Sequence, residues 1–246
     1  MENLNDQQKD IFNKYLNGEN IFITGPGGTG KTYLIKAIVN HAKENNKAYK
    51  VCALTGCAAI LLECGATTLH AFAGVGLATG SVNQVVDRVA KNKHRKVNWQ
   101  KTDILIIDEV SMLSLKLFII LDLIAKRIKH KRDTPFGGMQ IIFAGDFYQL
   151  PPVGDEEDID TTKFCFESPL WNDLFELKNQ IILQTIFRQT DNKYAKILNK
   201  LRVGKITTTG MTELQKCVGK TFTDELNPTI LLPRRKDVDI INNREY

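Results

Sequence analysis

The amino-acid sequence predicts an α/β fold with a mostly parallel sheet. Short apolar runs of high β-propensity alternate with helical stretches along the chain, as in folds built from strand–helix–strand units. The runs 104–107 and 141–144 contain only apolar residues, which is typical of strands that are covered on both faces. A glycine-rich stretch at 25–32 stands between a strand-like run and a helix-like segment, the context of a phosphate-binding loop. These observations together predict a P-loop NTPase domain.

The expected elements follow one another in a regular order. The apolar run Ile21–Ile23 is the first expected strand, and the segment 33–39 continues the glycine-rich stretch as a helix. Strands are predicted at 20–24, 49–54, 104–107, 140–144, 181–184 and 229–232. Helices are predicted at 6–17, 31–45, 56–63, 114–130, 169–175 and 191–203.

Length and composition limit the classes of protein to which the chain can belong. With 246 residues it has room for one large domain, or for one domain and part of another. Hydrophobic residues make up 43% of the chain, but they form no apolar stretch of about 18 residues that would span a membrane. The five cysteines are odd in number and include no C-x-x-C pair, so reduced thiols in an intracellular protein are expected. The polar first residues are unlike a secretory leader.

The charge of the chain is unevenly distributed. The formal net charge is +5, yet the window from Arg88 to Arg132 holds twelve Lys or Arg residues and four Asp or Glu residues, a local net charge of +8. Such a cluster can attract a polyanion, and solvated loops and helix faces are an equally good interpretation. Charge alone therefore identifies no partner.

Residues 25–32 read Gly-Pro-Gly-Gly-Thr-Gly-Lys-Thr and match the P-loop pattern. Its glycines let backbone N–H groups turn toward phosphate oxygens, and the following helix presents its positive end to the anion. Lys31 is expected to reach the β- and γ-phosphates, and the Thr32 hydroxyl to ligate Mg²⁺. The predicted cofactor-binding residues of the loop are Gly25, Pro26, Gly27, Gly28, Thr29, Gly30, Lys31 and Thr32. The chain is therefore expected to bind a nucleoside triphosphate.

Two acidic residues, Asp108 and Glu109, follow the buried strand expected at 104–107. Acids at the carboxyl end of a parallel strand stand where such folds bind ligands. Asp108 is expected to hold the Mg²⁺ shell, and Glu109 is the candidate base that orients or deprotonates the attacking water. The alternative is that both acids cap the next helix.

A polar glutamine, Gln149, follows the strand expected at 140–144 in the stretch 145–153, Gly-Asp-Phe-Tyr-Gln-Leu-Pro-Pro-Val. Its amide carries a donor and an acceptor, so it can sense a γ-phosphate or position a water molecule. A purely structural turn explains the stretch equally well.

These motifs, in this order, resemble those of the Pif1-like group of superfamily 1B helicases. The blocks that carry the resemblance are the P-loop, Ile106–Leu113, Gly145–Val153 and Phe187–Gln189. Further marks are Thr55–Ala59, Thr67–Gly74 and Phe136–Gly138. The resemblance runs from about Leu4 to the end of the chain, and it implies a RecA-like motor domain that uses ATP and Mg²⁺.

The resemblance implies further roles at the nucleotide. Gln8 resembles the glutamine that reads adenine near the N-terminus of these helicases. Gln149 resembles the residue that couples the γ-phosphate to DNA, and Arg188 resembles an arginine that reaches the γ-phosphate from the second motor domain. The catalytic set expected on this basis is Lys31, Asp108, Glu109, Gln149 and Arg188.

The resemblance also places DNA contacts in the segment 55–72. The predicted DNA-binding residues are Thr55, Gly56, Thr68, His70 and Phe72. The two threonines and the histidine can bond phosphate oxygens, and the ring of Phe72 can offer its face to a base. For Phe72, burial in the core is an equally good alternative. The expected partners are single-stranded DNA and DNA junctions, with no membrane partner.

The sequence departs from the family in its last part. A Thr-x-His-x-x-Gln-Gly block and a Ser-Arg pair of the second motor domain are absent, so the chain is expected to be an N-terminal portion of such a motor. The predicted domains are a RecA-like ATPase domain at 1–184 and the beginning of a second RecA-like domain at 185–246. The expected function is that of an ATP-dependent DNA helicase translocating 5′ to 3′ on single-stranded DNA. The alternatives are a DNA-binding module that does not unwind, and an ATPase that acts on protein partners.

Overall fold

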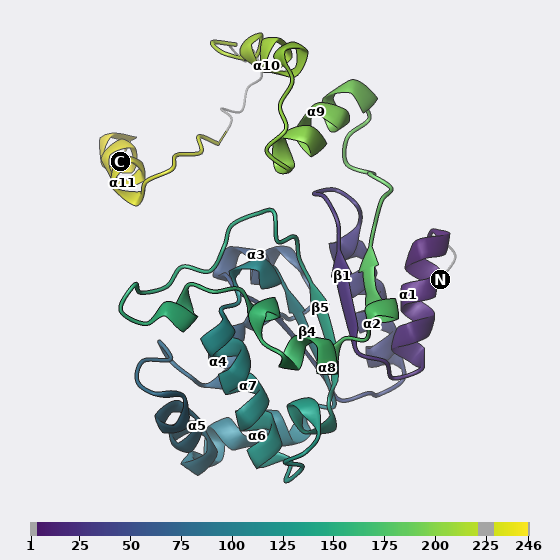
Figure 1. Cartoon of the computed structure of the whole chain (residues 1–246), viewed down its shortest axis with the longest axis vertical. Helices are drawn as coiled ribbons and strands as arrows, with labels where there is room; N and C mark the ends of the chain where they lie inside the picture. The colour runs from purple at the N-terminus through teal and green to yellow at the C-terminus, as the bar shows by residue number, and fades with distance from the viewer. Residues whose placement is uncertain (1–3, 221–228, 246) are drawn as a thin grey trace. The chain divides into compact units, whose positions relative to one another are not determined.

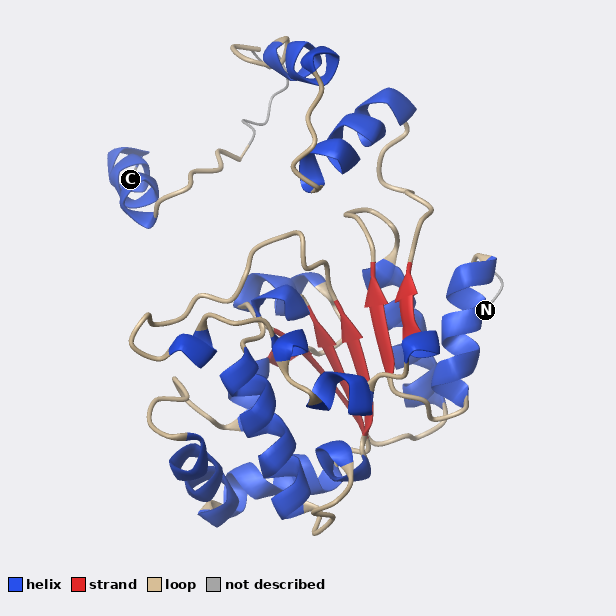
Figure 2. Cartoon of the chain, viewed as in Figure 1, coloured by secondary structure: helices blue, strands red, loops and turns tan. Residues whose placement is uncertain are grey.

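Figure 1 traces the chain in a computed structural model, which describes residues 4–220 and 229–245. Contacts divide the chain into two compact units, Met1–Gly204 and Lys205–Tyr246. The first unit contains a six-stranded sheet with helices on both faces (Figure 2). No helix in the described ranges is long and apolar enough to cross a membrane.

The sheet is parallel throughout. Its strands are β1 (Ile21–Thr24), β2 (Tyr49–Ala53), β3 (Thr67–Thr68), β4 (Ile104–Asp108), β5 (Gln140–Ala144) and β6 (Gln180–Ile182). They lie side by side in the order β3-β2-β4-β5-β1-β6, and every pairing is parallel. The prediction of an α/β fold with a mostly parallel sheet is confirmed.

The central strands are buried on both faces, as their apolar composition predicts. Along β4, Leu105 and Ile107 belong to one hydrophobic cluster, and Ile104 and Ile106 belong to the other. Successive side chains of a strand point to opposite faces, so each face of the sheet has its own core.

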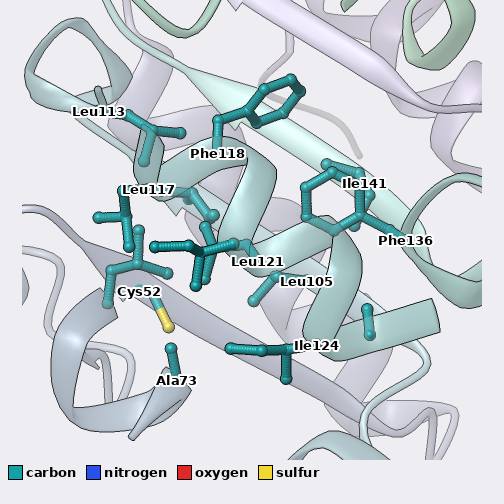
Figure 3. Close-up of a cluster of buried hydrophobic side chains, with 14 of the residues drawn as sticks. Cys52, Ala73, Leu105, Leu113, Leu117, Phe118, Leu121, Ile124, Phe136 and Ile141 are labelled. Carbon is teal, nitrogen blue, oxygen red and sulfur yellow. The ribbon is translucent and has the colours of Figure 1, made fainter. Parts of the chain in front are cut away.

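The larger core lies under helix α7 (Leu115–Ile128), and Figure 3 shows how its side chains meet the sheet. Leu117, Phe118, Leu121 and Ile124 are spaced at three- and four-residue intervals, so they form one apolar stripe on the helix. Burial of each such side chain stabilises the fold by about 1.5–3 kcal/mol relative to exposure. The helices α4 (Leu69–Ala73), α5 (Val82–Lys91), α6 (Lys93–Lys101) and α8 (Leu170–Leu174) contribute residues to the same cluster.

The opposite face is covered by α1 (Asp6–Leu16) and α2 (Lys31–Glu44), with a contribution from α3 (Gly56–Leu61). Asn5 caps α1 in a capping box with Gln8, and each donates a backbone N–H to the other's side-chain oxygen. The helix α2 begins directly at the glycine-rich stretch, and its buried residues, from Leu34 onward, anchor this end of the helix on the sheet.

Three neighbouring strands carry the predicted nucleotide residues at their carboxyl ends. The order β4-β5-β1 brings the ends of these strands to one edge of the sheet, with Ile107 opposite Phe143 and Ala144 opposite Ile23. The glycine-rich stretch follows β1, the two acids stand at the end of β4, and the segment that carries Gln149 follows β5. Parallel pairing therefore gathers segments that are far apart in the sequence.

The structure corrects several expected elements. Residues 229–232 form no strand in the described part of the chain, although they were predicted to be one. The short strand β3 and the helices α4, α5 and α6 were not predicted. The remaining α-helix of the first unit is α9 (Asn192–Arg202), close to the prediction of 191–203.

The second unit contains α10 (Thr208–Gln215) and α11 (Arg235–Glu245). The first compact unit extends to Gly204, beyond the expected boundary after residue 184. The assignment of 185–246 to a second motor domain stays a prediction.

Candidate nucleotide-binding site

The glycine-rich stretch forms a tight loop that another segment of the chain covers closely. Gly28 has φ 84°, and a Cβ at this position would stand 2.6 Å from the Cβ of Arg188. The Gly28 carbonyl accepts hydrogen bonds from the backbone N–H groups of Phe187 at 2.8 Å and Arg188 at 3.3 Å. Glycine is required here because a side chain would push this segment off the loop.

Lys31, the first residue of α2, turns its ammonium group back toward the loop. Its Nζ donates to the carbonyl oxygens of Gly25 at 2.7 Å and Pro26 at 3.0 Å. Burial lowers the pKa of Lys31, while the carboxylates of Asp146, Asp108 and Glu109 oppose that shift. A cation surrounded by carbonyls and carboxylates at a helix N-terminus is well placed to meet a polyphosphate.

Asp108 is a buried carboxyl at the end of β4, only 6% exposed. Its Oδ1 accepts from the backbone N–H of Glu109 at 2.9 Å. Burial raises the pKa of Asp108 to about 6. A nearby cation would stabilise the charged form of this buried carboxyl, because the attraction offsets the loss of hydration.

Glu109 has a backbone conformation that is uncommon for its residue type. Its φ is 58° and its ψ is 40°, in the left-handed region. Non-glycine residues in this region are strained and cluster at functional sites. Glu109 also makes no side-chain cap to the short helix that follows it, and α7 is capped by Ser114 instead. The alternative in which both acids cap the next helix is therefore not what the structure contains.

A cavity of about 360 Å³ joins these groups. Its lining combines the P-loop with residues from three other segments: Gly27, Gly28, Thr29, Gly30, Lys31, Thr32, Asp108, Glu109, Gln149, Phe187 and Arg188. All five predicted catalytic residues thus face one space, although Arg188 is 157 positions after Lys31 in the chain. The volume suits a polar small molecule, and the donors, acids and helix end suit phosphates.

Gln8 and Phe187 lie at the Gly30 side of this site. Gln8 is 2% exposed, and a Cβ at Gly30 would stand 2.6 Å from its Nε2 and 3.6 Å from the ring of Phe187. The predicted adenine contact of Gln8 stays a prediction, since its Oε1 already accepts from Asn5 in the helix cap. Phe187 belongs to a sequence block that carries the resemblance, although no role was predicted for it, and its exposed ring is part of the cavity lining.

Two residues of the chain fit a divalent cation beside the loop. Thr32 presents a hydroxyl at the cavity, and Asp108 presents the buried carboxyl described above. Oxygen donors of this kind are the ligands that Mg²⁺ prefers, together with phosphate oxygens. The donor set therefore fits the predicted ion.

The predicted DNA-binding residues begin at the carboxyl ends of β2 and β3. Thr55 and Thr68 are N-caps, and their hydroxyls accept from the backbone N–H groups of Ala58 at 3.2 Å and Ala71 at 3.3 Å. His70 is half-buried, and burial lowers its pKa. A neutral imidazole retains one donor and one acceptor.

The remaining two predicted DNA-binding residues differ in their exposure to solvent. Gly56 is exposed, and nothing lies within 4 Å of a Cβ placed there, so a strand can approach its backbone. Phe72 is 3% exposed and packs against Trp99 with ring centroids 4.9 Å apart. The burial of Phe72 favours the alternative that places its ring in the core, and its assignment to the DNA-binding set stays a prediction.

Known proteins resemble this chain in sequence and in structure. It is 38% identical over 246 residues to the ATP-dependent DNA helicase PIF1 of Saccharomyces cerevisiae, a match that covers 98% of this chain and 28% of that protein. The Pif1 helicase from Candida albicans superposes with a TM-score of 0.89 at 36% identity, over 98% of this chain and 54% of the other. Bacteroides Pif1 in complex with ADP-AlF3 and ssDNA gives a TM-score of 0.81 at 27% identity, over 98% and 56%. The chain spans about a third of the length of the curated relatives it matches.

A family model described as PIF1-like helicase matches residues 3–212. The matched range includes every residue that lines the cavity, from the P-loop to Arg188. The sequence match and the fold agree, and the chain belongs to the PIF1-like helicase family.

Proposed function

We propose that this chain is the nucleotide-binding part of a motor that couples ATP hydrolysis to movement along single-stranded DNA, as in an ATP-dependent DNA helicase. The observation that carries the proposal is the convergence of Lys31, Asp108, Glu109, Gln149 and Arg188 on one cavity. Such a set supplies cations for the phosphates, an acid for Mg²⁺ and a base for water, which are the parts that phosphoryl transfer to water requires.

In the proposed reaction a water molecule attacks the γ-phosphorus of ATP and the bond to the β-phosphate oxygen breaks. Glu109 accepts the proton of the attacking water, and Gln149 orients that water through its amide. Lys31 and Arg188 stabilise the charge that develops on the transferred group and on the leaving oxygen. Mg²⁺ held by Thr32 and Asp108 would neutralise part of the phosphate charge when bound.

The proposed DNA path uses the same edge of the sheet. Thr55 follows β2, the strand next to β4 and its acids, and Thr68 stands at the end of β3, on the other side of β2. Contacts from hydroxyl groups and His70 to phosphates would hold a strand without regard to its sequence. The Bacteroides relative, in complex with ADP-AlF3 and ssDNA, supports a motor that holds both ligands at once.

The rate of ATP hydrolysis with and without single-stranded DNA tests the proposal. We expect DNA to stimulate the rate, and Lys31→Ala to lower the affinity for ATP and abolish hydrolysis. Lys36→Ala is the matched control, because Lys36 lies on the same helix and pairs with Glu63 at 2.8 Å, outside the lining of the cavity. A rate of ATP hydrolysis that is the same with and without DNA would instead favour an ATPase that acts on protein partners.

A strand-displacement assay separates a helicase from a DNA-binding module. The assay uses a labelled duplex with a 5′ single-stranded tail, because 5′-to-3′ movement is proposed. A chain that binds DNA in a nucleotide-dependent way but displaces no strand would support the binding module.

A further inference from the structure

A bidentate ion pair joins the end of β5 to the end of helix α9. Arg202 donates from Nε to Asp146 Oδ2 at 2.6 Å and from Nη2 to Oδ1 at 2.5 Å. The Asp146 side chain is 1% exposed and that of Arg202 is 21% exposed. Paired geometry of this kind is specific to arginine and is among the stronger hydrogen-bonded arrangements in proteins.

The same carboxylate also holds Gln149 and its loop. Asp146 accepts from Gln149 Nε2 at 3.2 Å and from the Tyr148 backbone N–H at 3.2 Å. Burial alone would raise the pKa of Asp146, but the bonds from Arg202 and Gln149 hold it below its usual value, so the group is a carboxylate. With one N–H of Gln149 bound to Asp146, its carbonyl oxygen and second N–H remain for a water molecule and a phosphate oxygen.

Arg202 also fixes the segment that carries Arg188. The guanidinium group lies over the Tyr148 ring at 4.4 Å from the centroid, a second attachment to the same loop. At the other end of the segment, the backbone of Arg188 is bonded to Gly28. A second cavity of about 290 Å³ lies between these attachments, and Asp146, Gln149, Arg188 and Arg202 all line it.

The Asp146–Arg202 pair also affects the net charge beside the predicted phosphate site. Asp146 is the carboxylate with the largest effect in raising the pKa of Lys31. Without Arg202, a buried negative charge would remain uncompensated beside the site for a polyanion. Such a charge would disfavour a triphosphate more than a diphosphate, because the triphosphate carries the additional γ-phosphate charge.

We propose that Arg202 is a positioning residue of the motor: through Asp146 it orients the Gln149 amide, neutralises a carboxylate next to the γ-phosphate position and keeps Arg188 over the P-loop. The proposal rests on the proposed function, since it assigns Arg202 to the recognition of ATP over ADP. A merely stabilising ion pair would affect both nucleotides equally.

The test is the ratio of the affinities for ATPγS and ADP, measured with the full chain by competition against a fluorescent ADP. We expect Arg202→Gln to lower the preference for ATPγS by about tenfold, the scale of one charge-assisted hydrogen bond, and to change ADP affinity by less than about threefold. Arg202→Lys keeps the charge without the bidentate geometry, so its preference for ATPγS over ADP should lie between those of the parent and of Arg202→Gln. Lys200→Ala is the matched control, because it removes an exposed cation from the same helix.

A double-mutant cycle identifies the route of the effect. In an Asp146→Asn background, Arg202→Gln should change the ratio by less than about twofold, since its partner is already neutral. An unchanged ratio in Arg202→Gln, or an equal effect in both backgrounds, would overturn the assignment of Arg202. If the wild-type chain bound neither nucleotide, the proposed function itself would fail. ADP binding shows in each variant that the P-loop is folded, so loss of folding is not confused with loss of discrimination.

Discussion

Gly25 provides a sharp test of how the chain holds its nucleotide loop. Its φ is 141°, and a Cβ at this position would stand 2.5 Å from the carbonyl oxygen of Leu183. Leu183 follows β6, and its N–H donates to Thr24 at 2.8 Å. Gly25→Ala therefore introduces backbone strain and forces the end of β6 away from β1.

The expected loss of stability follows from these two effects. Strain at such a φ costs roughly 1–3 kcal/mol, and one weakened hydrogen bond adds about 1 kcal/mol. The sum is about 2–4 kcal/mol, which for a unit of this size lowers the melting temperature by roughly 5–15 °C.

Gly27→Ala is the matched control within the same loop. Nothing lies within 4 Å of a Cβ at Gly27, and its φ lies outside the left-handed region. Thermal and urea unfolding of both variants measure the difference, and we expect Gly27→Ala to lie within about 0.5 kcal/mol of the parent. Equal stability of the two variants would refute the argument that Leu183 excludes a side chain from position 25.

Three further predictions concern catalysis, DNA and pH. Glu109→Gln should retain ATP binding and slow hydrolysis by about 10²-fold or more, measured as single-turnover phosphate release, and normal turnover would remove Glu109 from the mechanism. Thr68→Ala and His70→Ala should weaken single-stranded DNA binding equally for different base sequences in an anisotropy titration. Thr68→Asn retains a cap and shows whether helix stability alone explains the loss. Burial raises the pKa of Cys52 from 9.0 to about 12, so the folded chain keeps a proton that the unfolded chain releases above pH 9. Below pH 9 the Cys52 thiol should therefore not affect the free energy of unfolding, and above pH 9 it should lower it by up to about 1.4 kcal/mol per pH unit. Urea unfolding at pH 8 and pH 10 measures this decline, and the Cys52→Ala variant should lack the part that comes from the thiol.

Local sequence rules were sufficient for the central sheet and for the nucleotide residues. The P-loop, β4 and β5 combine strong apolar runs with characteristic ends, so neighbouring residues alone reveal them. The helix α5 was missed although Ser81 and Gln84 form a capping box that the sequence displays. The helix α6 is harder to predict, because it is rich in charge and buries only Trp99.

Long-range contacts account for the other differences. The pairing of Asp146 with Arg202 joins positions 56 apart, and no local pattern predicts it. The burial of Phe72 depends on Trp99, which lies in the unpredicted α6. At 229–232 the apolar side chains Ile230 and Leu231 are exposed, and a run of strand-forming residues becomes a strand only when it finds a partner strand.

The contacts of Lys31 have a consequence for the speed and selectivity of ligand exchange. Its ammonium rests on two carbonyls of its own loop, Gly25 and Pro26, so the chain provides an internal substitute for the anion. A phosphate oxygen that binds Lys31 Nζ competes with these two carbonyl acceptors. A single weak anion competes poorly with them, whereas a chain of linked phosphates can engage the loop amides first and then draw the lysine across. Lys31 should therefore favour polyphosphates over single anions, because only a polyphosphate can contact the lysine and the backbone N–H groups of the loop together.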